Sequence, residues 1–171
     1  MWEKHLNALL ALLLAVILWG AFGIQFFKHE QPCPLCLLQR LGMLGVAAGA
    51  LMNVKFKPHK FYYGLSLLSA AFGGFVALRH IFLHICPGFP TFGHPFWGLS
   101  LYTWSFIIFA CTIVYIALLL IFFDSKEPPN LKEGRLNWWG QLAFVLTFLV
   151  ALTNIFMTLH QCGLSVCADV L

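Results

Sequence analysis

Five long apolar runs limit what this chain can fold into. They cover residues 6–27, 35–54, 61–85, 99–123 and 138–160. Each run is about as long as the roughly 20 residues that a transmembrane helix needs. Charged residues make up 9% of the chain, against roughly 25% in soluble domains. We therefore expect an all-α integral membrane protein with five membrane-spanning helices.

The first run and the positive charges together predict how the chain lies in the membrane. The run is longer than the apolar part of a typical signal peptide and lacks a convincing cleavage site, so we expect it to remain as an anchor. Seven of the ten lysines and arginines then fall on one side of the spans: Lys4, Lys55, Lys57, Lys60, Lys126, Lys132 and Arg135. Positive residues prefer the cytoplasmic side. The N-terminus is therefore predicted to be cytoplasmic and the C-terminus periplasmic, in a bacterial inner membrane, and the net charge of +4 is no argument for nucleic acid.

A two-cysteine motif, QPCPLCLLQR at residues 31–40, opens the second apolar run. Proline suits the first position of a helix, where its missing N–H costs nothing. Pro34 therefore places Cys33 at the helix entrance and Cys36 inside the first turn. The unpaired N–H groups and the positive dipole end of that helix favour a thiolate. The motif thus predicts a reactive pair of cysteines at the mouth of a membrane helix.

An arginine follows the second cysteine by four residues. Cys36 and Arg40 share one face of the predicted helix, and Gln39 lies beside them. An arginine inside an apolar run costs about 2.5–3.5 kcal/mol on insertion scales. It is therefore expected to face protein, a cavity or a polar ligand. The alternatives are a structural disulfide, half of a metal site, or an arginine that reaches the lipid headgroups.

The predicted topology places five of the six cysteines on the outer side of the membrane: Cys33, Cys36, Cys86, Cys162 and Cys167. Cysteines gathered on the oxidising side of a bacterial membrane are a redox pattern. Cys111 alone falls in the middle of a span, where a cysteine usually serves as a small packing residue.

The outer end of the third run carries three polar side chains, Arg79, His80 and His84. The two histidines are one helical turn apart, so they could bind a metal or donate a hydrogen bond to a polar ligand. They could equally be ordinary interfacial residues. The loop at residues 86–97 contains three prolines and could cover a cavity that opens towards Cys36.

Small residues in the second and third runs predict a close helix contact. Gly42, Gly45 and Gly49 lie on the face roughly opposite the motif, and Gly45 and Gly49 form a small-xxx-small pair. Ala70 and Gly74 are expected to play the same part in the third run.

The segment CPLCLLQR, placed after a first span, resembles the DsbB family of quinone-linked disulfide-generating membrane proteins. The family motif is Cys-x-x-Cys followed four residues later by arginine. The segments LRHIFLH and GLSLYTWS also look like family segments, so the resemblance covers about residues 6–123. It implies a four-helix transmembrane bundle of DsbB type over residues 1–123. A cytoplasmic loop at 124–137 and an additional fifth transmembrane helix with a periplasmic tail at 138–171 would follow.

The resemblance implies a membrane protein-disulfide oxidoreductase. It would pass electrons from a periplasmic DsbA-like thioredoxin-fold dithiol protein to a membrane quinone, of ubiquinone or menaquinone type. Cys33 and Cys36 would cycle between disulfide and dithiol. Cys36 would lie next to the quinone ring, and Arg40 would stabilise negative charge on a quinone oxygen. The predicted quinone-binding residues are Arg40, Gln39, Arg79, His80 and His84.

The chain departs from the family in where its other cysteines lie. The family carries a second reactive pair in the loop between the third and fourth spans, whereas this loop has one cysteine, Cys86. A fifth span delivers Cys162 and Cys167 to the same side. We predict that Cys162 and Cys167 replace the missing pair, or that Cys86 bonds to one of them. The alternative is a structural disulfide that clasps the tail.

Two other classes of protein compete with this reading. A metal-handling membrane protein could use thiol and imidazole ligands on one side, and Cu(I) or Zn(II) would suit them. The candidate ligands are Cys33, Cys36, His80, His84, Cys86, His94 and Cys162. A cation at Arg40 would oppose such a site. The third class is a redox-inactive membrane scaffold with structural disulfides.

Overall fold

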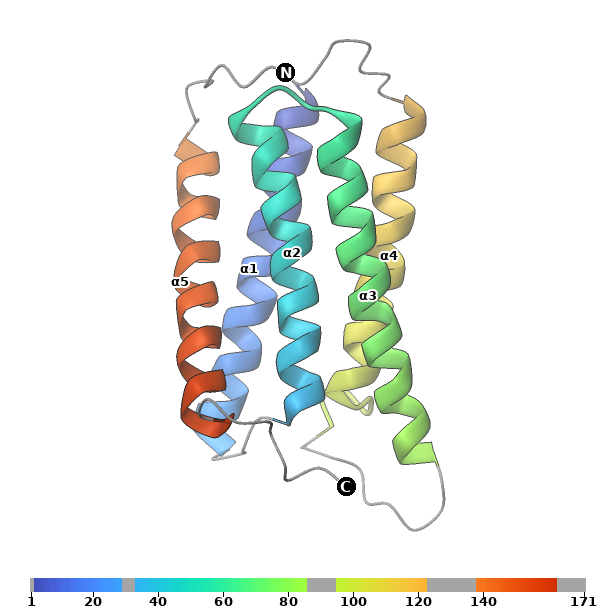
Figure 1. Cartoon of the computed structure of the whole chain (residues 1–171), viewed down its shortest axis with the longest axis vertical. Coiled ribbons are helices and arrows are strands. Elements are labelled where there is room, and N and C mark those ends of the chain that lie inside the picture. The colour runs from blue at the N-terminus through green and yellow to red at the C-terminus, as the bar shows by residue number, and fades with distance from the viewer. Residues whose placement is uncertain (1, 29–32, 86–94, 123–137, 163–171) are drawn as a thin grey trace.

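The protein forms five helices in a computed structural model that describes residues 2–28, 33–85, 95–122 and 138–162. The helices are α1 (Trp2–Lys28), α2 (Pro34–Lys55), α3 (Lys60–Ile85), α4 (Leu101–Phe122) and α5 (Trp138–Cys162) (Figure 1). Each is long and apolar enough to cross a membrane. The predicted all-α membrane bundle is confirmed. The predicted loop at 124–137 lies outside the described residues.

The start of α4 differs slightly from the prediction. The apolar run begins at residue 99, whereas α4 begins at Leu101. Phe96 and Leu99 pair their backbones in an isolated bridge. Between them, Trp97 (φ 50°) and Gly98 (φ 78°) adopt the left-handed conformation, which cannot continue a right-handed helix.

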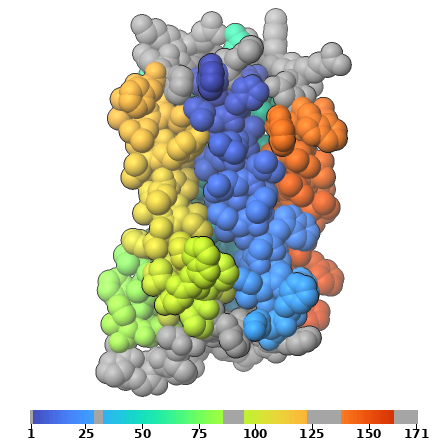
Figure 2. Space-filling model, turned by 180° about the vertical axis from the view of Figure 1, so that it is seen from behind, coloured from blue at the N-terminus to red at the C-terminus, as the bar shows by residue number. Residues whose placement is uncertain are grey.

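The helices pack side by side along their length. The α2 helix packs against α1 and α3, and α3 packs against α4. The fifth helix packs against α1 and α2, and seen from behind, α1 lies between α4 and α5 (Figure 2). The described residues of α1 and α4 do not pack closely on each other. The end of the bundle at which α2 begins, which we call the motif end, lies opposite the N-terminus (Figure 1).

The contact between α2 and α3 depends on glycines, as predicted for α2. In α3 the close approach falls at Gly73 and not at the predicted Gly74, where a β-carbon would meet Phe109 of α4 at 3.5 Å. A β-carbon on Gly42 would lie 2.8 Å from the Gly73 Cα, and one on Gly49 would lie 2.8 Å from the Tyr62 carbonyl oxygen. Across this seam the Ser66 hydroxyl donates to the Val46 carbonyl at 3.2 Å. The backbones of α2 and α3 therefore approach too closely for larger residues at these positions.

The α4 helix places its largest fully buried side chain against the contact between α2 and α3. Phe109 is 1% exposed, and its ring occupies the space that a β-carbon on Gly73 would need. The prediction that Cys111 packs in the interior is wrong, because its side chain is exposed. The buried residues of α4 follow a single stripe: Tyr102, Phe109, Thr112, Ile116 and Leu119. Cys111 lies off that stripe.

A buried polar network joins the helices at the end opposite the motif. The Asn7 amide donates to the Tyr63 hydroxyl at 2.7 Å, and the Asn53 amide donates to Asn7 Oδ1 at 3.2 Å. These residues come from α1, α3 and α2. The Tyr115 hydroxyl of α4 donates to the Leu6 carbonyl of α1 at 3.1 Å. At this end, therefore, α1 and α4 are directly joined.

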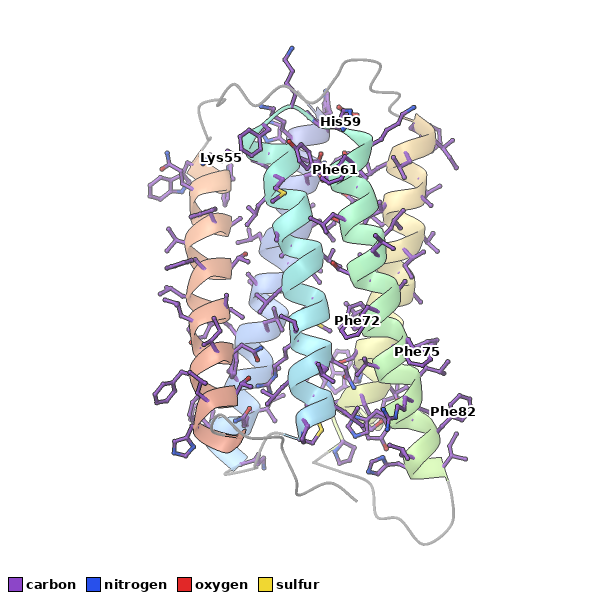
Figure 3. The ribbon with its side chains drawn as sticks, in the orientation of Figure 1. Lys55, His59, Phe61, Phe72, Phe75 and Phe82 are labelled. Atoms are coloured by element: carbon purple, nitrogen blue, oxygen red, sulfur yellow. A yellow bond between two sulfur atoms is a disulfide. The ribbon has the colours of Figure 1, made fainter. Side chains whose placement is uncertain are left out.

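The outer surface of the helices is apolar, as lipid contact requires. Phe75 and Phe82 of α3 are 68% and 60% exposed and point away from the bundle (Figure 3). The lipid-facing side of α5 is likewise apolar. Its inward stripe includes Ala143, Thr147, Val150 and Asn154, and the small residues among them let α5 lie close to α1 and α2.

Replacement of Gly73 by alanine is predicted to destabilise the bundle. Overpacking a close contact typically costs about 1–3 kcal/mol, and the buried Phe109 ring that meets the new β-carbon cannot move away freely. The matched control is Gly64→Ala in the same helix, where a β-carbon meets nothing within 4 Å. This change should be neutral or stabilise the helix by about 0.5–1 kcal/mol. Unfolding of the detergent-solubilised protein measures both, and equal effects would contradict the packing argument.

Candidate redox site

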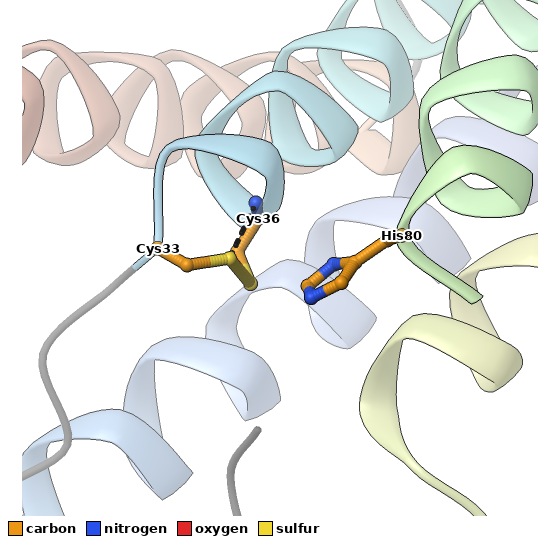
Figure 4. A group of neighbouring side chains, drawn as sticks. All are labelled: Cys33, Cys36 and His80. Carbon is orange, nitrogen blue, oxygen red and sulfur yellow. Dashed lines mark hydrogen bonds between the residues drawn. A yellow bond between two sulfur atoms is a disulfide. The ribbon is translucent and has the colours of Figure 1, made fainter. Parts of the chain in front are cut away.

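The first turn of α2 has the geometry that the motif predicts. Pro34 begins the helix, and Cys33 is its N-cap in an extended conformation (φ −76°, ψ 150°). The Cys36 backbone N–H donates to the Cys33 sulfur at 3.1 Å. The two cysteines form a disulfide, with their Cα atoms 5.2 Å apart (Figure 4). The disulfide therefore lies at the positive end of the helix dipole, where a thiolate released by reduction is stabilised.

A buried histidine from α3 faces this disulfide. His80 is 1% exposed, and its imidazole edge is turned towards the sulfur atoms (Figure 4). A ring nitrogen and both sulfurs all lie within 4.8 Å of one another. The Gln39 side-chain amide, 3% exposed, pairs with His80 Nδ1 at 3.1 Å. Because an amide nitrogen can only donate, Nδ1 accepts in this arrangement and the ring proton lies on Nε2.

Stacked rings join α3 to α4 beside the histidine. The Tyr102 ring lies 4.4 Å from the His80 ring and 5.3 Å from the His84 ring, measured between centroids. His84 Nδ1 donates to the His80 carbonyl oxygen at 3.0 Å. Tyr102 is itself buried. The stack therefore holds His80 in place from the side of α4, while Gln39 holds it from the side of α2.

The α1 helix holds the arginine. Arg40 Nη1 donates to Gln25 Oε1 at 2.8 Å, and the guanidinium lies 4.3 Å above the centre of the Phe22 ring. A cation over an aromatic ring gains about 0.5–2 kcal/mol, more when water is excluded. The expectation that Arg40 faces protein and a cavity is confirmed, since its side chain contacts α1 and lines the cavity described next.

A cavity of about 450 Å³ lies between α1, α2 and α4. Its α1 wall is apolar and includes the small residues Gly20 and Ala21. The α2 wall contributes Cys36, Gln39 and Arg40, and the α4 wall contributes Tyr102 and Ser105 among apolar neighbours. Small-molecule sites have this size and this mixture of apolar walls with a few polar groups.

The segment before α4 contributes a side chain to the cavity wall. Phe96 lines the cavity, and the Trp104 indole N–H donates to its carbonyl oxygen at 2.9 Å. This bond ties the turn at residues 95–99 to the first turn of α4. The cavity is thus lined by this turn as well as by α1, α2 and α4.

The structure brings some of the predicted site residues together and separates others. Cys36, Gln39 and Arg40 line one cavity, and His80 lies behind Gln39 and Tyr102. His84 is one turn further along α3 and is not part of the cavity lining. Arg79 is exposed.

The predicted roles of the outer cysteines beyond the motif stay predictions. Cys86 and Cys167 lie outside the described residues, as does His94. Cys162 is the last residue of α5, and its side chain is not described. The relay and the tail disulfide therefore stay predictions, as do the roles of Arg79, His80 and His84 in binding a quinone.

Sequence reasoning missed four residues that shape the site: Phe22, Gln25, Tyr102 and Ser105. A signal for Gln25 was present, because a polar residue inside an apolar run seeks a partner within the protein. Tyr102 and Ser105 are three residues apart and so share a helix face. Nothing in the sequence indicated that Phe22 would lie beneath Arg40.

The fold and the site define a multi-pass membrane protein with a disulfide at the mouth of one helix. The family described as Disulfide bond formation protein DsbB matches residues 3–92, which span α1 to α3. The chain belongs to the DsbB family, as its resemblance predicted.

Curated relatives agree with this membership. Disulfide bond formation protein B of Burkholderia pseudomallei is 37% identical over 97 residues, which are 51% of this chain and 53% of the relative. The protein of the same name from Chromobacterium violaceum is 39% identical over 84 residues, 44% of this chain and 51% of the relative. That from Burkholderia thailandensis is 28% identical over 152 residues, 70% of this chain and 90% of the relative. The chain thus spans about half the length of the first two relatives. No solved structure matches.

The pair formed by Gln25 and Arg40 is predicted to contribute to stability. Gln25→Leu removes the acceptor of the guanidinium, and hydrogen bonds to charged groups are worth about 1.5–3 kcal/mol. A double-mutant cycle measures this, with Gln25→Leu made in the wild type and in an Arg40→Met background. We expect the loss of unfolding free energy to be much smaller in the second background. Equal losses in both would show that Gln25 acts independently of Arg40.

Proposed function

We propose that this protein generates disulfides as a membrane thiol oxidase. It would pass two electrons from a periplasmic DsbA-like thioredoxin-fold dithiol protein to a membrane quinone of ubiquinone or menaquinone type. The observation that carries the proposal is the shared cavity of Cys36 and Arg40, within helices that can cross a membrane. Family membership supports the same chemistry. The proposed orientation has the N-terminus in the cytoplasm of a bacterium and the motif end at the periplasm.

The residues around the cavity fit a quinone. Its apolar walls suit a lipid-soluble ring and tail, and its volume of about 450 Å³ suits a small molecule. Arg40 offers guanidinium donors to a carbonyl oxygen, and Ser105 places a hydroxyl on the α4 wall. When bound, a quinone supplies the acceptor for two electrons and two protons. The loose packing of α1 against α4 supports entry from the lipid side.

The two cysteines have different surroundings, which suggests different tasks. Cys33 caps the helix and does not line the cavity, whereas Cys36 does. An incoming thiolate is expected to attack the Cys33 sulfur, forming a mixed disulfide and releasing Cys36 as a thiolate. The second thiol of the attacking pair then displaces Cys33, so that this pair becomes a disulfide and Cys33 and Cys36 remain as a dithiol. In the relay the attacking pair belongs to the tail, and its disulfide is then reduced by the dithiol of the partner, which leaves oxidised.

Re-formation of the Cys33–Cys36 bond removes two electrons and two protons from the dithiol. The imidazole of His80 lies within 4.8 Å of the sulfurs. It can accept a thiol proton on Nε2 when the Gln39 amide turns its carbonyl oxygen to an Nδ1–H group. Arg40 is a fixed cation on the cavity wall, and such a charge favours negative charge that develops on an acceptor oxygen. Its bond to Gln25 keeps the guanidinium in place, so little reorganisation is needed.

The tail is proposed to relay electrons to this site. The α5 helix packs on α1 and α2 and ends at the motif end of the bundle (Figure 1). This placement puts the end of α5, and with it the backbone of Cys162, at the same end of the bundle as Cys33. The proposed relay uses Cys162 and Cys167 as a pair, or one of them with Cys86. A structural clasp of the tail is the alternative.

Quinone reduction by the purified protein, supplied with a reduced thioredoxin-fold dithiol protein, tests the proposal. Cys36→Ser should abolish turnover. Arg40→Ala should raise the quinone KM about 10–100-fold, which corresponds to the loss of one hydrogen bond to a charged group. Cys111→Ser, which changes an exposed cysteine of α4, should leave turnover unchanged. If the wild type reduces no quinone with any dithiol, the redox-inactive scaffold and the metal-handling protein become the better interpretations.

The same assay separates the two readings of the tail. Loss of turnover in the double variant Cys162→Ser/Cys167→Ser, with direct oxidation of small dithiols retained, is the result expected of a relay. Full turnover would identify a structural clasp instead.

A bulky residue on the α1 wall is predicted to block the cavity. Ala21→Trp should fill the space beside Cys36 and Arg40 and so prevent quinone reduction. The disulfide lies at the edge of the cavity, so one equivalent of oxidised protein should still oxidise a reduced dithiol partner. The control is Val16→Trp, an exposed position on the same helix that does not line the cavity. Unchanged quinone reduction in Ala21→Trp would show that the acceptor binds elsewhere.

A further inference from the structure

We propose that the reduced form of this protein binds a thiophilic metal ion such as Zn²⁺ through Cys33, Cys36 and His80. These three side chains are brought together from α2 and α3, and their donor atoms lie within 4.8 Å of one another (Figure 4). The binding requires only that the disulfide can be reduced. Its consequence for turnover rests on the proposed oxidase function.

The distances suit a tetrahedral ion once the disulfide opens. Bonds of about 2.3 Å to sulfur and 2.0–2.1 Å to nitrogen place tetrahedral ligands about 3.5–3.8 Å apart. Reduction lets the two sulfurs move to non-bonded contact, which for heavy atoms is about 3.5–4.0 Å. The histidine must then approach by about 1 Å. Two cysteines separated by two residues also have the spacing of zinc ligands.

Gln39 is placed to orient the histidine as a ligand. A metal-bound histidine usually donates its other ring N–H to a carbonyl or carboxylate. The Gln39 side chain, paired with His80 Nδ1 at 3.1 Å, carries a carbonyl oxygen as well as an amide nitrogen. A half-turn of that amide would present the oxygen to an Nδ1–H group. Nε2 would then carry the lone pair that binds the ion.

The charges permit a buried ion at this position. Two thiolates neutralise a divalent cation, so the occupied site adds no net charge to the bundle. Arg40 would oppose the ion, but its guanidinium is directed to Gln25 and Phe22 of α1. Two thiolates and an imidazole favour Zn²⁺ or Cu⁺ over Mg²⁺ or Ca²⁺, which prefer oxygen ligands.

Metal binding would be coupled to the redox state without any transfer of electrons. Two thiols release two protons as the ion binds, and two metal–thiolate bonds form. In the disulfide the sulfurs are bonded to each other and provide no thiolate. While the ion is bound, the sulfurs cannot form the disulfide. Zn²⁺ would therefore hold the protein in its reduced form and inhibit re-oxidation.

Zn²⁺ binding to the full-length protein in detergent tests the inference. The other cysteines are first removed by Cys86→Ser, Cys111→Ser, Cys162→Ser and Cys167→Ser, so that Cys33 and Cys36 are the remaining thiols. We expect one equivalent of Zn²⁺ to bind the reduced protein in competition with a chromophoric chelator, and none to bind the oxidised protein. Co²⁺, used as a spectroscopic probe, should show a thiolate-to-metal absorption band in the reduced protein.

Variants of the histidine and of its partner make the test specific. His80→Ala should weaken binding by more than tenfold, and Gln39→Leu should weaken it about 10–100-fold, as loss of a hydrogen-bond partner behind a metal ligand does. The matched control is His84→Ala, which removes the imidazole that packs beside His80 and should weaken binding much less than His80→Ala does. Equal binding by oxidised and reduced protein, or an unchanged affinity in His80→Ala, would overturn the site.

Different results would contradict the proposed metal site and the proposed oxidase function. Zn²⁺ that binds the dithiol but leaves quinone turnover unaffected would overturn the inhibitory role. Binding to the dithiol in a protein that reduces no quinone would support the metal site while overturning the proposed function.

Discussion

The close approach of α2 and α3 is the contact on which the site depends. A β-carbon on Gly42 would lie 2.8 Å from the Gly73 backbone, so these helices meet almost backbone to backbone. This approach brings His80 of α3 within reach of Gln39 and of the disulfide on α2. In lipid, such contacts rest on packing and hydrogen bonds because the hydrophobic effect does not favour one apolar neighbour over another. Small residues in the middle of the helices therefore control the chemistry at their end.

The cavity forms because α1 and α4 are joined at one end of the bundle and separated at the other. At the end opposite the motif, the Tyr115 hydroxyl bonds to the Leu6 carbonyl of α1, and buried asparagines tie α1 to its other neighbours. At the motif end, a cavity of about 450 Å³ separates α1 from α4. Arg40 crosses from α2 to α1 there and bonds to Gln25. The arginine thus both lines the cavity and fixes one of its walls.

The membrane spans and the start of α2 could be predicted because both depend on local sequence. Apolar length determines the spans, and Pro34 with its flanking cysteines determines where α2 begins. The pairing of Gln39 with His80 could not be predicted, since residues 41 positions apart meet through the α2–α3 contact. The same holds for Phe22 beneath Arg40 and for the exposed position of Arg79. Cys111 was misjudged because α4 buries one narrow stripe, and the rotation of an almost wholly apolar helix leaves no trace in its sequence.

Because the cavity lies between α1 and α4, its occupancy depends on the concentration of ligand in the lipid and not on that in water. A lipid-soluble ligand that enters between two membrane helices reaches the cavity from the bilayer, in which it is dissolved and diffuses in two dimensions. Its saturation would then follow the mole fraction of ligand in the lipid, and not its amount per volume of water. Diluting the membrane with more lipid at constant total ligand would empty the cavity, whereas adding buffer would not. Occupancy would thus be a property of the membrane in which the protein is embedded.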